Sequence, residues 1–124
     1  MTEDVDGGQI FRAAWIEGVR RHYPGEPKAS YVTPWEDTPE WERRAAAAVY
    51  EQVRSFLTAT DGAATKLTRE QKGRFVALCW TGQMYTHFED PKPAYVADWS
   101  AMPQWQRETD ADIFDRVAAA VRAR

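Results

Sequence analysis

The sequence has very little cysteine, since Cys79 is the single one among its 124 residues. A lone cysteine excludes an internal disulfide and leaves no cysteine spacing for a metal site. Cys79 lies in an apolar run with helical periodicity, which predicts a buried and unreactive thiol. We therefore expect no metal and no other cofactor.

Long apolar runs and basic blocks are also missing. No apolar segment approaches the roughly 20 residues that span a bilayer, and the acidic residues 1–8 lack the apolar core of a secretory signal. The net charge is −3, and basic residues alternate with acids, a pattern that does not attract phosphate backbones. We expect a cytoplasmic protein without a membrane or nucleic-acid partner, and residues 1–8 as a disordered lead.

Catalytic motifs are absent as well. The sequence contains no glycine-rich phosphate loop, no H-E-x-x-H motif, and no serine or cysteine nucleophile with a positioned base. Asp110, Asp112 and Asp115 share one predicted helix, where their carboxylates are expected to form solvated surface. We therefore expect a protein that is not an enzyme.

Tryptophan, in contrast, is abundant, with six residues. Residues 27–43 and 91–107 both read P-K-x-[AS]-Y-V-x-x-W-x-x-x-P-x-W-x-R, 64 positions apart, and the preceding helices match at a shift of 65. All tryptophans and both histidines fall on matched positions: Trp15 with Trp80, Trp35 with Trp99, Trp41 with Trp105, and His22 with His87. This duplication predicts two tandem repeats, residues 9–60 and 68–124, in a single domain spanning 9–124.

Each repeat has the pattern of two helices joined by a connector. Apolar residues at three- and four-residue spacing predict four helices, at about 9–23, 39–60, 68–87 and 103–124. Thr38 is expected to cap the second helix, and Thr68 to open the third with a capping box. The fold is thus predicted as mainly α with pseudo-twofold symmetry. The axis is expected to pair Tyr31-Val32 with Tyr95-Val96 as a short antiparallel β ladder.

The stretch P-W-E-D-T-P-E-W-E-R at residues 34–43 resembles P-Y-x-x-L-P-E-x-E-K of the ryanodine-receptor (RyR) repeat. The second copy departs from this pattern at Asp98, which replaces the first proline, and matches the leucine position with Met102. The overall pattern also resembles small tandem-repeat proteins of actinobacteria. The resemblance implies a helical pair with a short strand in each repeat, a twofold dimer-like domain, no enzymatic activity, and, from bacterial relatives, sensing of nucleotide-like ligands.

The matched tryptophans are the first candidate site residues. Trp15 and Trp80 look like the tryptophan of the first helix of the RyR repeat. They either belong to the core or face each other across a slot and sandwich a planar ring. Trp35 and Trp99, in the connectors, either cover the core or form exposed contacts.

Charged and titratable residues are the second group of candidates. His22 and His87 follow Trp15 and Trp80 by two turns, and are either helix-end histidines or part of the site. As a pair without further ligands they make a weak metal site. Lys28 and Lys92, together with Arg12, either supply charge to an anionic ligand or form solvated surface.

Together these observations predict a non-enzymatic module that recognises a small planar anionic, nucleotide-like ligand between the repeats. The alternative is a protein–protein interaction or adaptor module that acts through exposed aromatic residues of the connectors. In either case we expect a monomer or a homodimer.

Overall fold

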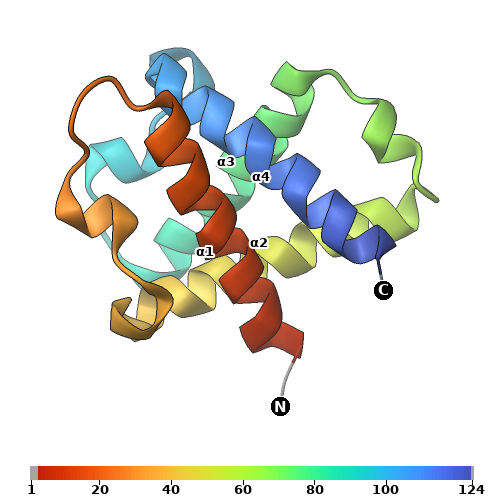
Figure 1. Cartoon of the computed structure of the whole chain (residues 1–124), viewed down its shortest axis with the longest axis horizontal. Helices are drawn as coiled ribbons and strands as arrows, with labels where there is room; N and C mark the ends of the chain where they lie inside the picture. The colour runs from red at the N-terminus through yellow and green to blue at the C-terminus, as the bar shows by residue number, and fades with distance from the viewer. Residues whose placement is uncertain (1–2, 124) are drawn as a thin grey trace.

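The computed structural model describes residues 3–123, which form four long helices and five short 3₁₀ helices (Figure 1). The long helices are α1 (Glu3–His22), α2 (Glu40–Ala59), α3 (Arg69–His87) and α4 (Gln104–Arg122). The 3₁₀ helices are η1 (Ala29–Val32), η2 (Trp35–Asp37), η3 (Ala63–Lys66), η4 (Pro93–Val96) and η5 (Trp99–Ala101). The element order α1-η1-η2-α2 recurs as α3-η4-η5-α4, as the duplication predicts.

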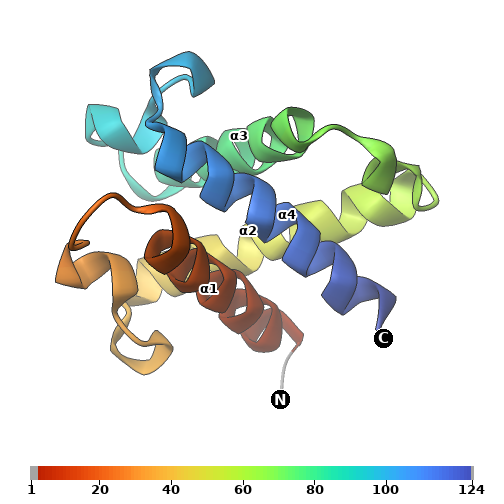
Figure 2. The ribbon, with the colours of Figure 1, turned by 45° about the horizontal axis from the view of Figure 1, so that its top comes forward.

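The two repeats pack into one body with a common core. α1 packs against α2 and α4, and α3 packs against α4, with a smaller contact between α2 and α3. Both connectors lie at one end of the molecule and the linker containing η3 lies at the other (Figures 1 and 2). The buried cluster takes residues from all four helices, including Phe11, Val49, Val76 and Phe114. The apolar stripes of both repeats are therefore buried against each other.

The connectors do not form the predicted β ladder, because the described residues contain no strand. Tyr31 and Tyr95 each lie in a 3₁₀ turn, where their N–H groups donate to the carbonyls of Lys28 (3.0 Å) and Lys92 (2.9 Å). These local bonds use backbone groups that a ladder would have needed. In the first connector the carbonyl of Ser30 is also bonded by the side chain of Arg12. The mainly α class is confirmed, but the β ladder is wrong.

The helix ends test the predicted caps. Thr68 opens α3 with a capping box to Gln71, as predicted, and Gly62 has the left-handed conformation (φ 82°) that follows α2. Thr38 does not cap α2, because its hydroxyl donates to the carbonyl of Pro34 (2.8 Å) and Pro39 is the capping residue. α1 begins at Glu3 and so includes residues 3–8, which were expected in a disordered lead. Residues 1–2 of that lead lie outside the described part of the chain.

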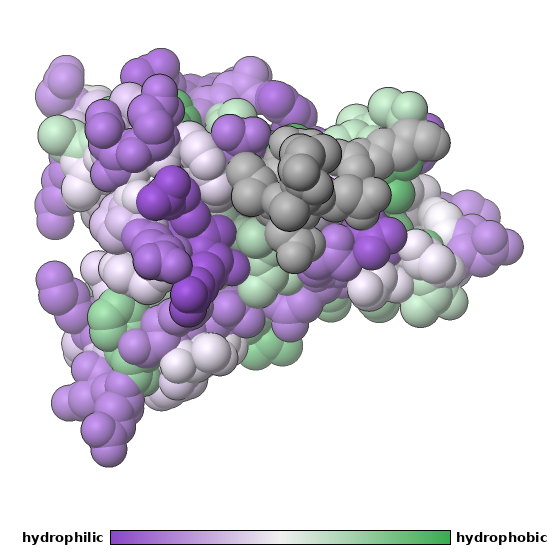
Figure 3. Space-filling view, turned by 90° about the horizontal axis from the view of Figure 1, so that it is seen from below, coloured by the Kyte–Doolittle hydropathy of each residue, from purple (hydrophilic) through white to green (hydrophobic). Residues whose placement is uncertain are grey.

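No helix of the described residues is long and apolar enough to cross a membrane. On the face shown in Figure 3, hydrophilic residues cover most of the surface and hydrophobic residues form small separate patches.

Candidate functional site

A cavity of about 220 Å³ lies at the seam between the two repeats. All four helices and both connectors contribute to its walls. Its aromatic lining comes from both repeats: Phe11, Trp15, Tyr31 and Trp41 from the first, and Trp80, Tyr95 and Trp105 from the second. The lining also includes the exposed residues Ser30 and Ala94, so the cavity opens to solvent at the connectors.

The tryptophans of α2 and α4 are exchanged between the repeats. Trp105 packs against Tyr23 and Tyr31 of the first repeat, with ring centroids 4.9 and 5.6 Å away. Trp41 makes the matched contacts to Phe88 (4.8 Å) and Tyr95 (6.4 Å) of the second repeat. Each repeat thus completes the aromatic cluster of the other, and the cavity lies where the two clusters meet.

Trp15 and Trp80 both line this cavity but occupy different environments. Trp15 donates its indole N–H to the carbonyl of Tyr31 (2.8 Å) and contacts Trp105 edge-on (5.7 Å). Trp80 stacks instead on Phe11 of the other repeat, with centroids 5.7 Å apart and planes 10° apart. The structure brings the predicted pair into one site, and each indole packs on other rings of the cavity wall.

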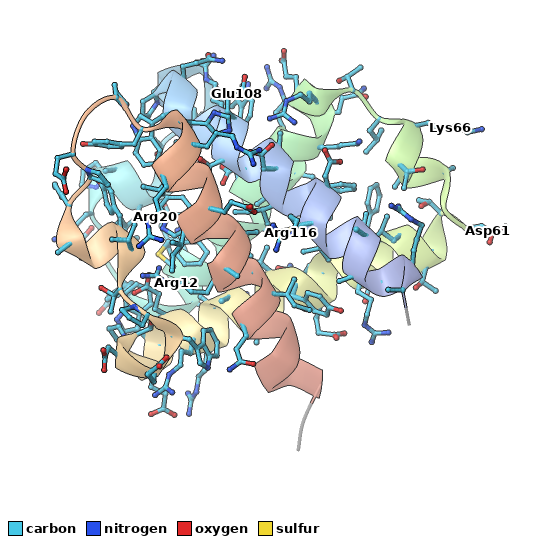
Figure 4. All side chains as sticks on the ribbon, in the orientation of Figure 1. Arg12, Arg20, Asp61, Lys66, Glu108 and Arg116 are labelled. Carbon is cyan, nitrogen blue, oxygen red and sulfur yellow. The ribbon has the colours of Figure 1, made fainter. Side chains whose placement is uncertain are left out.

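Arg12 holds the first connector in place from inside the cavity wall. Its guanidinium donates to the carbonyl of Thr33 (2.9 and 3.1 Å), to the carbonyl of Ser30 (3.2 Å) and to Glu42 (3.0 Å). Figure 4 shows the residue on the side of α1 that faces this connector. Burial lowers the pKa of Arg12 and raises that of Glu42, and the ion pair opposes both shifts. All three guanidinium nitrogens are occupied, so Arg12 has little capacity left for an anionic ligand.

The second repeat has neither the arginine nor its carboxylate partner. The positions matched to Arg12, Ser30, Thr33 and Glu42 carry Ala77, Ala94, Ala97 and Gln106. All four of these smaller or neutral residues line the cavity. The cavity therefore exists in part because three alanines replace the arginine and two of its contact residues.

Asp110 is the polar residue of the site that sequence reasoning missed. It lies on α4 in the cavity lining and is 6% exposed. Among the described residues nothing donates to its carboxyl, and burial alone raises the pKa of Asp110 well above its ordinary value. The expectation of solvated surface is wrong here, because Asp110 precedes Ile113 and Phe114 by three and four residues and so shares their buried face. That spacing was the available signal.

The histidines lie outside the cavity lining. His22 bonds Asp112 (2.8 Å), which also receives a hydrogen bond from Arg69 (2.8 Å). Although burial opposes it, these two bonds lower the pKa of Asp112. The ring of His87 lies 6.2 Å from that of Trp41. Among the described residues no group of three or more histidine, cysteine, aspartate or glutamate side chains is arranged to hold a metal.

The remaining predicted site residues flank the cavity without lining it. Lys28 and Lys92 are exposed, and each ammonium lies 5.8 Å from the ring centre of Tyr31 or Tyr95. Trp35 and Trp99 are half-buried in their own repeats. Each packs so closely on a glycine of the preceding helix that a Cβ there would meet the indole at 2.6 Å for Gly8 and 2.5 Å for Gly73. Arg43 and Arg107 lie beside these indoles.

Comparisons with known proteins return no match to a family model, a curated protein or a solved structure. The resemblance to the RyR repeat therefore stays a prediction from the quoted residues.

Proposed function

We propose that this protein is a small-ligand recognition module whose site is the cavity between the repeats. The observation that carries the proposal is a seam cavity walled by aromatic rings from both repeats and containing a buried carboxyl without a partner. Ligand sites in proteins are typically concave and mostly apolar, with a few polar groups that orient the ligand. The seam cavity has this composition.

The volume and the walls favour a planar ligand with one or two rings. An apolar cavity of about 150 Å³ takes benzene, and this one is about 220 Å³. Stacking on aromatic side chains contributes about 1–3 kcal/mol per ring in nucleic-acid complexes. The lining gives less support to an anionic ligand, because Arg12 is engaged with Glu42 and the unpaired group is an acid.

We infer that the cavity binds a ligand rather than catalysing a reaction. Besides the phenols of Tyr31 and Tyr95, the titratable residues in the lining are the paired Arg12 and Glu42 together with Asp110. Proton transfer in both directions usually needs a second group close to the first, with the two pKa values pushed apart. Asp110 has no such neighbour among the described contacts. An interaction module is less well supported, because Trp35 and Trp99, its predicted contacts, are half-buried against glycines.

A cavity-filling variant tests the location of the site. The fluorescence of the wall tryptophans and the melting temperature are measured against a panel of one- and two-ring compounds. Ala77→Leu places a larger side chain in the cavity and is expected to weaken binding at least tenfold. Ala13→Leu, at an exposed position of α1, is the matched control and should bind as the wild type does. Equal binding by Ala77→Leu would place the ligand elsewhere, and no binding by any compound would contradict the proposal.

A further inference from the structure

The two connectors share one backbone conformation although their contacts differ. Lys28 and Lys92, which precede η1 and η4, have φ,ψ of −60°,143° and −58°,141°. Thr33 and Ala97, which follow these turns, have −60°,132° and −66°,143°. The carbonyl groups that receive Arg12 in the first repeat therefore recur with similar directions in the second.

The recurring carbonyls have no side-chain donor in the second repeat. Arg12 reaches the carbonyls of Ser30 and Thr33, but the matched residue on α3 is Ala77, whose side chain has no polar atom. No side chain of the described residues donates to the carbonyls of Ala94 or Ala97. Alanine at position 77 also leaves the volume that an arginine side chain would fill.

The side chains around this position add acceptors. Gln106 stands where the first repeat has Glu42, and Asp110 lies one turn further along α4. Both line the cavity, and no described residue donates to either side chain. Two carbonyls, the amide oxygen of Gln106 and the carboxyl of Asp110 can all accept hydrogen bonds, so a ligand with several N–H donors matches this group.

Planar cations fit this arrangement better than point charges. A guanidinium or amidinium group presents its donors in a flat fork and stacks on aromatic faces, whereas an ammonium is compact and strongly hydrated. Tyr95 and Trp80 supply aromatic faces in the same lining. A cation bound beside the buried carboxyl of Asp110 favours its ionised form, which supplies the opposite charge that a buried cation requires.

We propose that the second-repeat side of the cavity binds the guanidinium or amidinium group of a small aryl ligand, in the place that Arg12 fills in the first repeat. The ligand donates to the carbonyls of Ala94 and Ala97 and to the side chains of Gln106 and Asp110. This inference rests on the proposed function and names the ligand class of the same cavity.

Three probes with one ring and different charge test the class: benzamidine, benzamide and benzoate. Calorimetry on the full chain is expected to show benzamidine binding at least tenfold more tightly than benzamide, and benzoate more weakly still. If benzamide or benzoate binds as well as benzamidine, the cation inference is overturned while the proposed function stands. If none of the three binds and the wider ring panel also fails, both are overturned.

The carboxyl is tested by Asp110→Asn, which keeps the shape of the side chain. This variant should lose at least tenfold in benzamidine affinity and less than twofold in benzamide affinity. Asp115→Asn, an exposed carboxylate on the same helix, is the control and should leave both affinities unchanged. Parallel losses for the two probes in Asp110→Asn would overturn the role of the carboxyl as the cation partner.

A tethered cation gives a test that needs no added ligand. Ala77→Arg restores the arginine of the first repeat, and its guanidinium should occupy the proposed position. The variant is expected to bind benzamidine at least tenfold more weakly and to melt at a higher temperature than Ala77→Met, which adds similar length without charge. A lower melting temperature than that of Ala77→Met would overturn the proposal.

Discussion

The two repeats differ most at the residues that hold the connector. In the first repeat, Arg12 joins the connector carbonyls to Glu42 on α2. In the second, Ala77 and Gln106 occupy these positions, and the connector keeps its conformation without them. The difference teaches that the connector does not require the arginine to form its turns. In the second repeat, Ala77 instead lines a cavity whose wall includes an unpaired carboxyl, Asp110.

The largest expected effect comes from breaking the arginine contact. Arg12→Ala leaves Glu42 without its ion-pair partner, and breaking buried pairs costs about 3–5 kcal/mol. Because the Glu42 side chain is 24% exposed, we expect about 3 kcal/mol, measured by urea unfolding. Arg20→Ala, at an exposed arginine two turns along α1, should change stability by less than about 0.5 kcal/mol.

The double variant Arg12→Ala, Glu42→Gln copies the second repeat into the first. It should recover part of the lost stability, because a neutral amide costs less to bury than an unpaired carboxylate. A double variant no more stable than Arg12→Ala would show that the loss of stability comes from packing rather than from the unpaired carboxylate of Glu42.

The next prediction concerns the pH dependence of stability. Asp110 contributes to it, whereas the matched residue of the first repeat, Ala46, has no titratable group. Burial raises the pKa of Asp110 in the folded protein above its ordinary value of 3.8. At a pH between the ordinary pKa of the unfolded state and the raised pKa of the folded state, the folded state binds more protons than the unfolded state. The contribution of Asp110 to the free energy of unfolding therefore falls as pH rises. The slope is at most about 1.4 kcal/mol per pH unit.

Asp110→Asn removes this contribution. Relative to the wild type, the variant should therefore gain stability as pH rises above about 4, measured by thermal or urea unfolding at a series of pH values. If the difference in free energy of unfolding between the wild type and the variant stays constant from pH 4 to pH 8, a raised pKa for Asp110 is contradicted.

The smallest effect concerns a feature that the repeats share. Gly73→Ala places a Cβ 2.5 Å from the indole of Trp99 and 3.3 Å from the carbonyl of Arg107. Such overpacking costs about 1–3 kcal/mol, and Gly8→Ala should cost a similar amount through Trp35. Gly82→Ala, on the same helix as Gly73 with no atom within 4 Å, should instead stabilise by about 0.5–1 kcal/mol. Equal effects at Gly73 and Gly82 would contradict the close packing of Trp99.

Much of the architecture is readable from the sequence because it depends on local rules. Helical periodicity, the capping box at Thr68 and the 64-residue repeat predict four helices in two matched halves, and the structure contains them. The β ladder was predicted from the strand propensity of Tyr31 and Tyr95. It does not form, because the N–H groups of these residues donate to carbonyls within their own 3₁₀ turns. Propensity is a weak guide when the alternative conformation satisfies the same hydrogen-bonding groups.

The candidate site was only partly predictable. Trp15 and Trp80 were named from the repeat, Arg12 was named as a possible charge for an anionic ligand, and all three line the cavity. Asp110 was assigned to the surface, because a carboxylate among other acids usually faces solvent. The exchange of Trp41 and Trp105 between repeats was also not foreseen, since it depends on how the two halves dock.

By itself, the sequence determined that four helices form in two matched halves, because these properties follow from neighbouring residues and from duplication. Only the tertiary structure decided that Arg12 donates its hydrogen bonds to its own connector. It also decided that Ala77, at the matched position, lines a cavity together with Asp110. The physical reason is that burial and pairing are set by residues distant in the chain, which meet only when the two repeats pack.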